Sequence, residues 1–187
     1  MIYPQKLNSK KSNMIVKIAI MISLLVAGIL LLINTIATPE IHWAGLCNAG
    51  ILYIWVTVLY SINKNINIGG HVLIQTVAIS LLTVYIDYKT GFKAWSIDLA
   101  IPIILIIANL TMLILTIISH RKYIKYVIYQ LILFALSMLP FLFVYENLVQ
   151  NKTLSYVASG ISIINFGLCL ILCKKDIKEE LIRKFHI

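Results

Sequence analysis

Histidine, tryptophan and aspartate side chains stand beside the ends of apolar runs, and these residue types could hold a small ligand. His42 and Trp43 come just before one run, Asp87 follows another, and Trp95 and Asp98 stand at the start of a third. If these ends meet on one side of a membrane, imidazole, indole and carboxylate groups would form a shallow ligand site. The alternative is interfacial anchoring and helix capping, because tryptophan is enriched at membrane–water interfaces.

Carboxamide side chains inside the apolar runs form a second candidate set. Gln75, Asn109, Gln130 and Asn165 each fall within a different run. In hydrocarbon such groups seek partners on neighbouring helices, and each bond is worth about 0.6 kcal/mol on average. Two interpretations stay open: an intramembrane polar pocket, or hydrogen bonds that only hold the helices together.

The sequence contains no pattern typical of a catalytic or metal centre. No Asp, Glu, Lys or Arg lies near the middle of an apolar run, where proton-coupled pumps place ionisable groups. The chain has no H-E-x-x-H, no G-x-S-x-G and no phosphate-binding glycine loop. Its three cysteines, Cys47, Cys169 and Cys173, do not have the spacing of a zinc or disulfide framework. We therefore expect no enzymatic activity, no cofactor and no metal.

The composition predicts an integral membrane protein. Of the 187 residues, 60% are apolar and only 12% are charged, and the mean hydropathy is +0.93. A soluble domain carries about 25% charged residues, so this chain has about half the charge of such a domain. These values exclude an ordinary soluble domain and a disordered chain.

Six apolar runs are long enough to cross a bilayer, which takes about 20 helical residues. We predict an all-α fold: a bundle of six transmembrane helices that forms a single domain over residues 1–187. The predicted spans are residues 14–36, 43–62, 71–86, 97–119, 123–145 and 154–173. Pro140 should kink the far end of the fifth span, because proline interrupts helical hydrogen bonding.

The tail, residues 174–187, has the pattern of a short amphipathic helix. Ile177, Leu181 and Phe185 recur at four-residue spacing and therefore share one helix face. Such a helix would lie on the inner membrane surface, or it would dock a cytosolic protein. Both interpretations stay open.

The distribution of basic residues predicts the orientation in the membrane. Six spans return the chain to its starting side, so 13 of the 16 basic residues fall on the side of both termini. Only Lys89, Lys93 and Lys152 fall on the other side. Because excess Lys and Arg mark cytoplasmic segments, we predict both termini in the cytoplasm. The same rule accounts for the net charge of +9, so no nucleic-acid partner is expected.

Several short segments together resemble a known family. They are Tyr3-Pro4, Trp43, Thr90-Gly91, Trp95, Pro102 and the closing Arg183-Lys184-Phe185-His186-Ile187. The chain is similar to a family of small, uncharacterised bacterial six-span membrane proteins, many of which carry an N-terminal zinc ribbon. No cysteine precedes the first span here, so neither the ribbon nor its zinc is expected. The resemblance implies the six-span architecture and a bacterial cell membrane, and it leaves the function open.

These observations predict a non-enzymatic membrane protein that acts through partners, as an accessory, sensor or immunity protein does. One alternative is a small-solute binding or permease component with a site on the extracytoplasmic face. Another is a membrane enzyme, for which the sequence shows no catalytic constellation. The expected partners are the lipid bilayer and a membrane or cytosolic protein that contacts the C-terminal helix.

Overall fold

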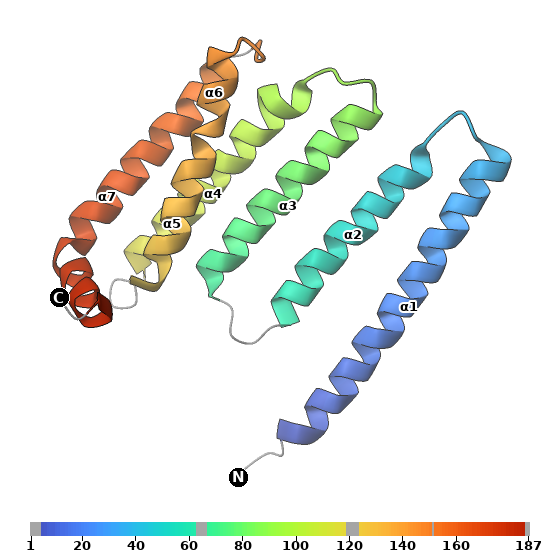
Figure 1. Cartoon of the computed structure of the whole chain (residues 1–187), viewed down its shortest axis with the longest axis horizontal. Helices are drawn as coiled ribbons and strands as arrows, with labels where there is room; N and C mark the ends of the chain where they lie inside the picture. The colour runs from blue at the N-terminus through green and yellow to red at the C-terminus, as the bar shows by residue number, and fades with distance from the viewer. Residues whose placement is uncertain (1–4, 63–66, 119–123, 151, 186–187) are drawn as a thin grey trace. The chain divides into compact units, whose positions relative to one another are not determined.

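The computed structural model describes residues 5–62, 67–118, 124–150 and 152–185. These residues form helices joined by short connections, and none of them forms a strand (Figure 1). The predicted all-α class is therefore confirmed. The elements are α1 (Gln5–Ala37), α2 (Trp43–Ile62), α3 (Ile68–Lys89), η1 (Ser96–Ala100, a π-helical turn), α4 (Ile101–Ile118), α5 (Ile124–Ser137), α6 (Leu139–Tyr145) and α7 (Lys152–Phe185).

Within the described residues, six helical segments are long and apolar enough to cross a membrane. They are Met14–Ala37, Trp43–Ile62, Ile68–Lys89, Ser96–Ile118, Val127–Tyr145 and Lys152–Ile171. Their bounds differ from the predicted spans by only a few residues. The third is longer at both ends, and its last turn includes Asp87, a residue whose charge suggested a loop. The helix ends after Lys89, where the N–H of Thr90 donates to the carbonyl of Ile86 at 2.9 Å.

The fifth span is interrupted where proline predicts it. α5 ends at Ser137, and α6 begins at Leu139 with Pro140 in its first turn. Proline lacks an N–H, and its ring displaces the carbonyl four residues earlier. The predicted kink at Pro140 is therefore confirmed.

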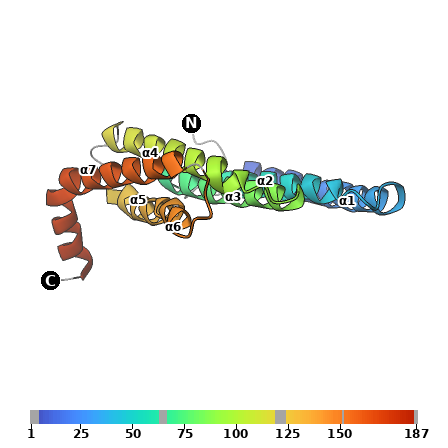
Figure 2. The same cartoon turned by 90° about the horizontal axis from the view of Figure 1, so that it is seen from above.

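The tail continues the last span as one helix. α7 runs from Lys152 to Phe185 without a break, although its membrane-length segment ends at Ile171. Figure 2 shows the last turns of α7 pointing away from the direction of the rest of that helix. The helix predicted for the tail is confirmed as far as Phe185, and the last two residues lie outside the described part.

The chain divides into two compact units, Met1–Trp55 and Val56–Ile187, which are described separately. The single domain stays a prediction. In the first unit, the indole Nε1 of Trp55 donates to Ser23 Oγ at 2.6 Å. The amide of Asn48 donates to the carbonyl of Ala27 at 3.5 Å. These contacts connect α2 to α1 by polar groups.

The second unit is built around α4. This helix packs against α3, α5 and α7, and α5 also packs against α7. Leu105, Ala108 and Met112 of α4 form the core with Leu133 of α5, and none of the four is more than 5% exposed. In the view of Figure 2, α4, α5 and α7 lie grouped together. This group positions most of the carboxamides that the sequence analysis singled out.

Candidate functional site

Asp87 organises the connection between α3 and η1. Its side chain is fully buried. Oδ1 accepts the backbone N–H of Lys93 at 3.0 Å, and Oδ2 accepts the backbone N–H of Ser96 at 3.2 Å and its hydroxyl at 2.8 Å. A buried carboxylate is costly unless donors surround it. Asp87 therefore holds the connection in place.

The backbone of this connection takes uncommon conformations. Gly91, Phe92 and Ala94 have positive φ angles of 100°, 45° and 60°, and such values are rare for residues with a Cβ. They persist where the surroundings impose them. Here Asp87 accepts the N–H of Phe92 through its own carbonyl at 2.8 Å, in addition to its side-chain contacts. The connection presents Phe92, which is 54% exposed, and Trp95, which is 36% exposed.

Asp98 joins two segments that are far apart in the sequence, η1 and the connection between α6 and α7. Its Oδ1 accepts the backbone N–H of Gln150 at 2.7 Å, which links η1 to the segment between α6 and α7. Asp87, Trp95 and Asp98 thus belong to one region of the second unit, since η1 packs against α3. Both of its carboxylates already accept backbone N–H groups.

His42 and Trp43 belong to the first unit. His42 is exposed in the connection between α1 and α2, and Trp43 begins α2. The indole Nε1 of Trp43 donates to Thr38 Oγ1 at 2.8 Å. The five residues of the predicted ligand site are therefore divided between the two units.

The sequence analysis missed Asn34, which organises the same connection in the first unit. Its Nδ2 donates to the carbonyls of Thr38 at 2.6 Å and Ile41 at 2.7 Å. Its Oδ1 accepts the N–H of Ala44 at 3.0 Å. The sequence did contain a signal for this role. Asn34 stands near the end of an apolar run and shortly before Thr38-Pro39, and asparagine side chains often form hydrogen bonds with the backbone of a turn.

Three of the four predicted carboxamides meet in the second unit. Gln130 Nε2 donates to Asn165 Oδ1 at 2.8 Å and to its carbonyl at 3.1 Å. Asn165 Nδ2 donates to the carbonyl of Asn109 at 3.0 Å. Asn109 Nδ2 donates to Ser137 Oγ at 2.8 Å. None of the three carboxamide residues is more than 2% exposed, so this amide cluster joins α5, α7 and α4 in the interior.

Hydroxyl groups continue the amide cluster along α7. Ser159 Oγ donates to the carbonyl of Ser137 at 3.1 Å. Ser155 and Ser162 are fully buried, and their hydroxyl oxygens have no hydrogen-bond partner in the structure. Sequence analysis noticed none of these serines as site residues, because serine is also a common small packing residue in membrane helices.

Gln75 lies apart from the amide cluster. It projects from α3, and its Nε2 donates to Thr57 Oγ1 of α2 at 2.9 Å. Near it, the ring of His71 stacks on Tyr60 with centroids 5.6 Å apart. Its Nε2 lies 3.4 Å from Ser61 Oγ. These side chains connect the end of α2 to the start of α3, and sequence analysis did not single out His71.

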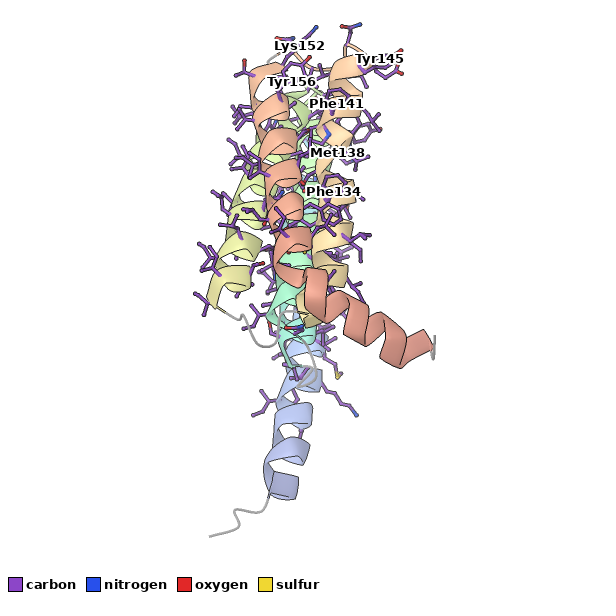
Figure 3. The ribbon with its side chains drawn as sticks, turned by 90° about the vertical axis from the view of Figure 1, so that its left-hand side faces the viewer. Phe134, Met138, Phe141, Tyr145, Lys152 and Tyr156 are labelled. Atoms are coloured by element: carbon purple, nitrogen blue, oxygen red, sulfur yellow. The ribbon has the colours of Figure 1, made fainter. Side chains whose placement is uncertain are left out.

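Aromatic side chains line the contact between α7 and the α5–α6 pair. The rings of Phe134 and Phe166 stack with centroids 4.7 Å apart, and those of Phe141 and Tyr156 lie 6.2 Å apart. Figure 3 shows Phe134 and Phe141 on the side of α5 and α6, and Tyr156 on α7. Aromatic pairs of this kind add about 0.5–1.5 kcal/mol beyond their buried area. This contact holds helices together without offering a reactive group.

The arrangement is suited to hydrogen bonding and packing. Its buried polar groups are amides, hydroxyls and one carboxylate, and each of the amides of the cluster bonds to a neighbouring helix. In the part of the chain that the structure describes, no group of three His, Cys, Asp or Glu side chains lies close enough to hold a metal ion.

Comparison with known proteins gives a family. A family model described as "Family of unknown function (DUF6320)" matches residues 3–187. No curated protein and no solved structure matches the chain. The match covers nearly the full sequence and agrees with the resemblance to an uncharacterised family. The chain therefore belongs to DUF6320.

Proposed function

We propose that this chain is a multi-pass protein of the cell membrane that acts through protein partners and catalyses no reaction. The six membrane-length helices support the location. The concentration of basic residues on the side of both termini supports a cytoplasmic position for both ends.

The observation that carries this proposal is the closed amide cluster. Gln130, Asn165 and Asn109 are buried and donate to one another and to the helix backbone. A site for a polar solute needs polar groups directed at the solute. Here those donors are used between helices, which favours a structural role for the membrane interior.

The carboxylates on either side of the α3–η1 connection support the same proposal. Asp87 and Asp98 accept backbone N–H groups and so fix the shape of the connections. General acid–base chemistry needs a carboxyl within reach of a substrate proton. Because both carboxylates already bond to the backbone of these connections, they favour a surface that recognises a partner over a catalytic site.

The partner contact that we propose is the part of α7 beyond Ile171. The helix continues to Phe185, and the sequence places Ile177, Leu181 and Phe185 on one face. Amphipathic helices with such a spacing pack into apolar grooves of partner proteins.

Native-state mass spectrometry of the protein in native-lipid discs tests this proposal. The full chain should retain a protein at a fixed stoichiometry, and a chain that ends at Lys175 should lose it. Leu181→Ser should also weaken the complex, whereas the matched change Glu179→Ser, which helical spacing puts on the opposite face, should preserve it. If the complex survives both truncation and Leu181→Ser, the docking role of α7 is wrong.

A second candidate function is a small-solute component with its site on the extracytoplasmic face. The preorganised connection that presents Phe92 and Trp95 favours it, because a fixed loop lowers the entropic cost of binding. The same purification distinguishes the two. A retained small molecule that disappears in Trp95→Ala, with no retained protein, would support the solute function and contradict the partner function.

A further inference from the structure

A groove lies between α3 and α4. Its volume is about 270 Å³. The residues that line it are His71, Val72, Gln75, Thr76, Ile79, Ile104, Ile107, Ala108 and Thr111. The groove is open at one side, because Ile107 in its wall is 59% exposed. Small residues at its base, such as Ala108, leave this space between the two helices.

The surface that faces the groove is apolar, although several of the residues that form it are polar. Thr76 Oγ1 donates to the carbonyl of Val72 at 2.8 Å, and Thr111 Oγ1 donates to the carbonyl of Ile107 at 2.8 Å. Gln75 donates to Thr57 on α2. Because these polar atoms bond within the protein, the space itself is bordered mainly by methyl and methylene groups. A polar solute would lose its hydration there without compensation.

The position of the groove corresponds to one leaflet of a bilayer. It extends from His71, near the start of α3, to Ile79, near the middle of that helix. Eight helical residues rise by about 12 Å. One half of a hydrocarbon core about 30 Å thick is about 15 Å. The groove therefore begins near a membrane surface and ends close to the midplane.

We propose that this groove holds one acyl chain of a membrane phospholipid as a resident ligand. The surrounding medium at this depth is hydrocarbon, and an apolar cavity of about 150 Å³ already accommodates a benzene molecule. The larger volume here accepts a length of acyl chain. The headgroup lies at the His71 end, which is the predicted cytoplasmic leaflet. This binding site rests on the proposed membrane location and orientation, but not on the proposed protein partner.

Filling the groove tests the proposal. Thr111→Phe places a ring in the groove, whereas Ile114→Phe adds a ring at a position on the same helix that is 54% exposed and does not line the groove. Native mass spectrometry after extensive detergent washing should find one phospholipid per chain in the natural protein and in Ile114→Phe. In Thr111→Phe the retained fraction should fall by about tenfold or more, as expected for a loss of 1.4 kcal/mol.

A second measurement does not depend on how well the filled variant folds. The natural protein is exchanged into a phospholipid that carries a diazirine on its acyl chain, washed and then illuminated. Peptide mapping should place the adduct on lining residues such as Ile104 or Thr111. Equal lipid retention by both variants, no lipid after washing, or adducts located only on α1 would each overturn the proposal.

Discussion

At the scale of single residues, one buried carboxylate determines the shape of a whole connection. Asp87 accepts three hydrogen bonds from Lys93 and Ser96 through its side chain. It does so at the end of α3, where the chain must turn through three positive φ angles to reach η1. Hydrogen bonds to a charged group contribute more than neutral ones, about 1.5–3 kcal/mol each. Asp87 should therefore matter more to stability than a typical polar residue near a membrane surface.

Asp87→Ala should lower the free energy of unfolding by about 3 kcal/mol, because it leaves buried N–H groups without an acceptor. Ser96→Ala removes only one of the three donors and should cost about 1 kcal/mol. Reversible unfolding by SDS titration in lipid–detergent micelles measures both. Equal, small losses for the two variants would show that the carboxylate does not hold the connection.

The amide cluster allows a second prediction at this scale. Asn165→Leu should lower the free energy of unfolding by about 1–2 kcal/mol, since interhelical hydrogen bonds in membranes reach about 1.7 kcal/mol. Gln130→Leu should cost less when Asn165→Leu is already present than it does alone, because the two side chains bond to each other. The measurement is a double-mutant cycle by SDS titration, and strictly additive losses would contradict the coupling.

Sequence reasoning located the amide cluster only in part, for a physical reason. Amides that are left unpaired in hydrocarbon are costly, and this cost predicts hydrogen bonds between helices for Asn109, Gln130 and Asn165. Which helices face one another does not follow from polarity, because each span is apolar on nearly every side. By residue type Gln75 is therefore an equal member of the set, although it bonds to Thr57. Asn34 was missed because its partners are backbone groups, namely the carbonyls of Thr38 and Ile41 and the N–H of Ala44.

At the scale of helices, a glycine permits the close approach of α2, α3 and α5. A Cβ built on Gly70 would lie 2.6 Å from the hydroxyl of Tyr60, and 3.1 Å from the ring of Tyr129. Tyr60 also stacks on His71, so its ring cannot move without losing that contact. A side chain at position 70 would therefore separate helices that now touch.

Gly70→Ala should lower the free energy of unfolding by about 1–3 kcal/mol, the usual cost of overpacking. Gly160→Ala on α7 is the matched control, because nothing lies within 4 Å of the added Cβ. That change should be neutral or stabilise by up to about 1 kcal/mol, since glycine is a poor helix former. SDS titration compares the two. A loss at position 160 as large as at position 70 would show that helix approach is not the cause.

The helices themselves were the most predictable part of the fold. Long apolar runs predict spans because backbone groups in hydrocarbon must bond within the segment, and Pro140 predicted the interruption at Met138. The ends were less predictable. The charge of Asp87 indicated a loop, yet this residue lies in the last turns of α3. Its carboxylate can be buried there because Lys93 and Ser96, which follow the helix, donate hydrogen bonds to it. The π-helical turn η1 had no signal in the sequence analysis.

At the scale of the whole molecule, the distribution of charge determines how the chain should lie in the membrane. Asp87, Lys89 and Asp98 fall at one end of the spans of the second unit, and the basic C-terminal part of α7 follows the other end. Basic segments are retained on the cytoplasmic side during insertion, whereas acids contribute little to orientation. The excess of Lys and Arg at the two termini and in the two connections on their side therefore predicts a cytoplasmic location for both ends.

Cysteine labelling in intact cells decides the orientation. In a background with Cys47, Cys169 and Cys173 changed to serine, Lys89→Cys should react with a membrane-impermeant maleimide. Lys122→Cys should react only after the cells are opened, because the positive-inside rule places that segment in the cytoplasm. Labelling of position 122 alone would invert the orientation and would move the headgroup end of the α3–α4 groove to the outer leaflet. Labelling of both positions in intact cells would contradict the six-span topology itself, because three membrane-length helices precede position 89 and a fourth lies between it and position 122.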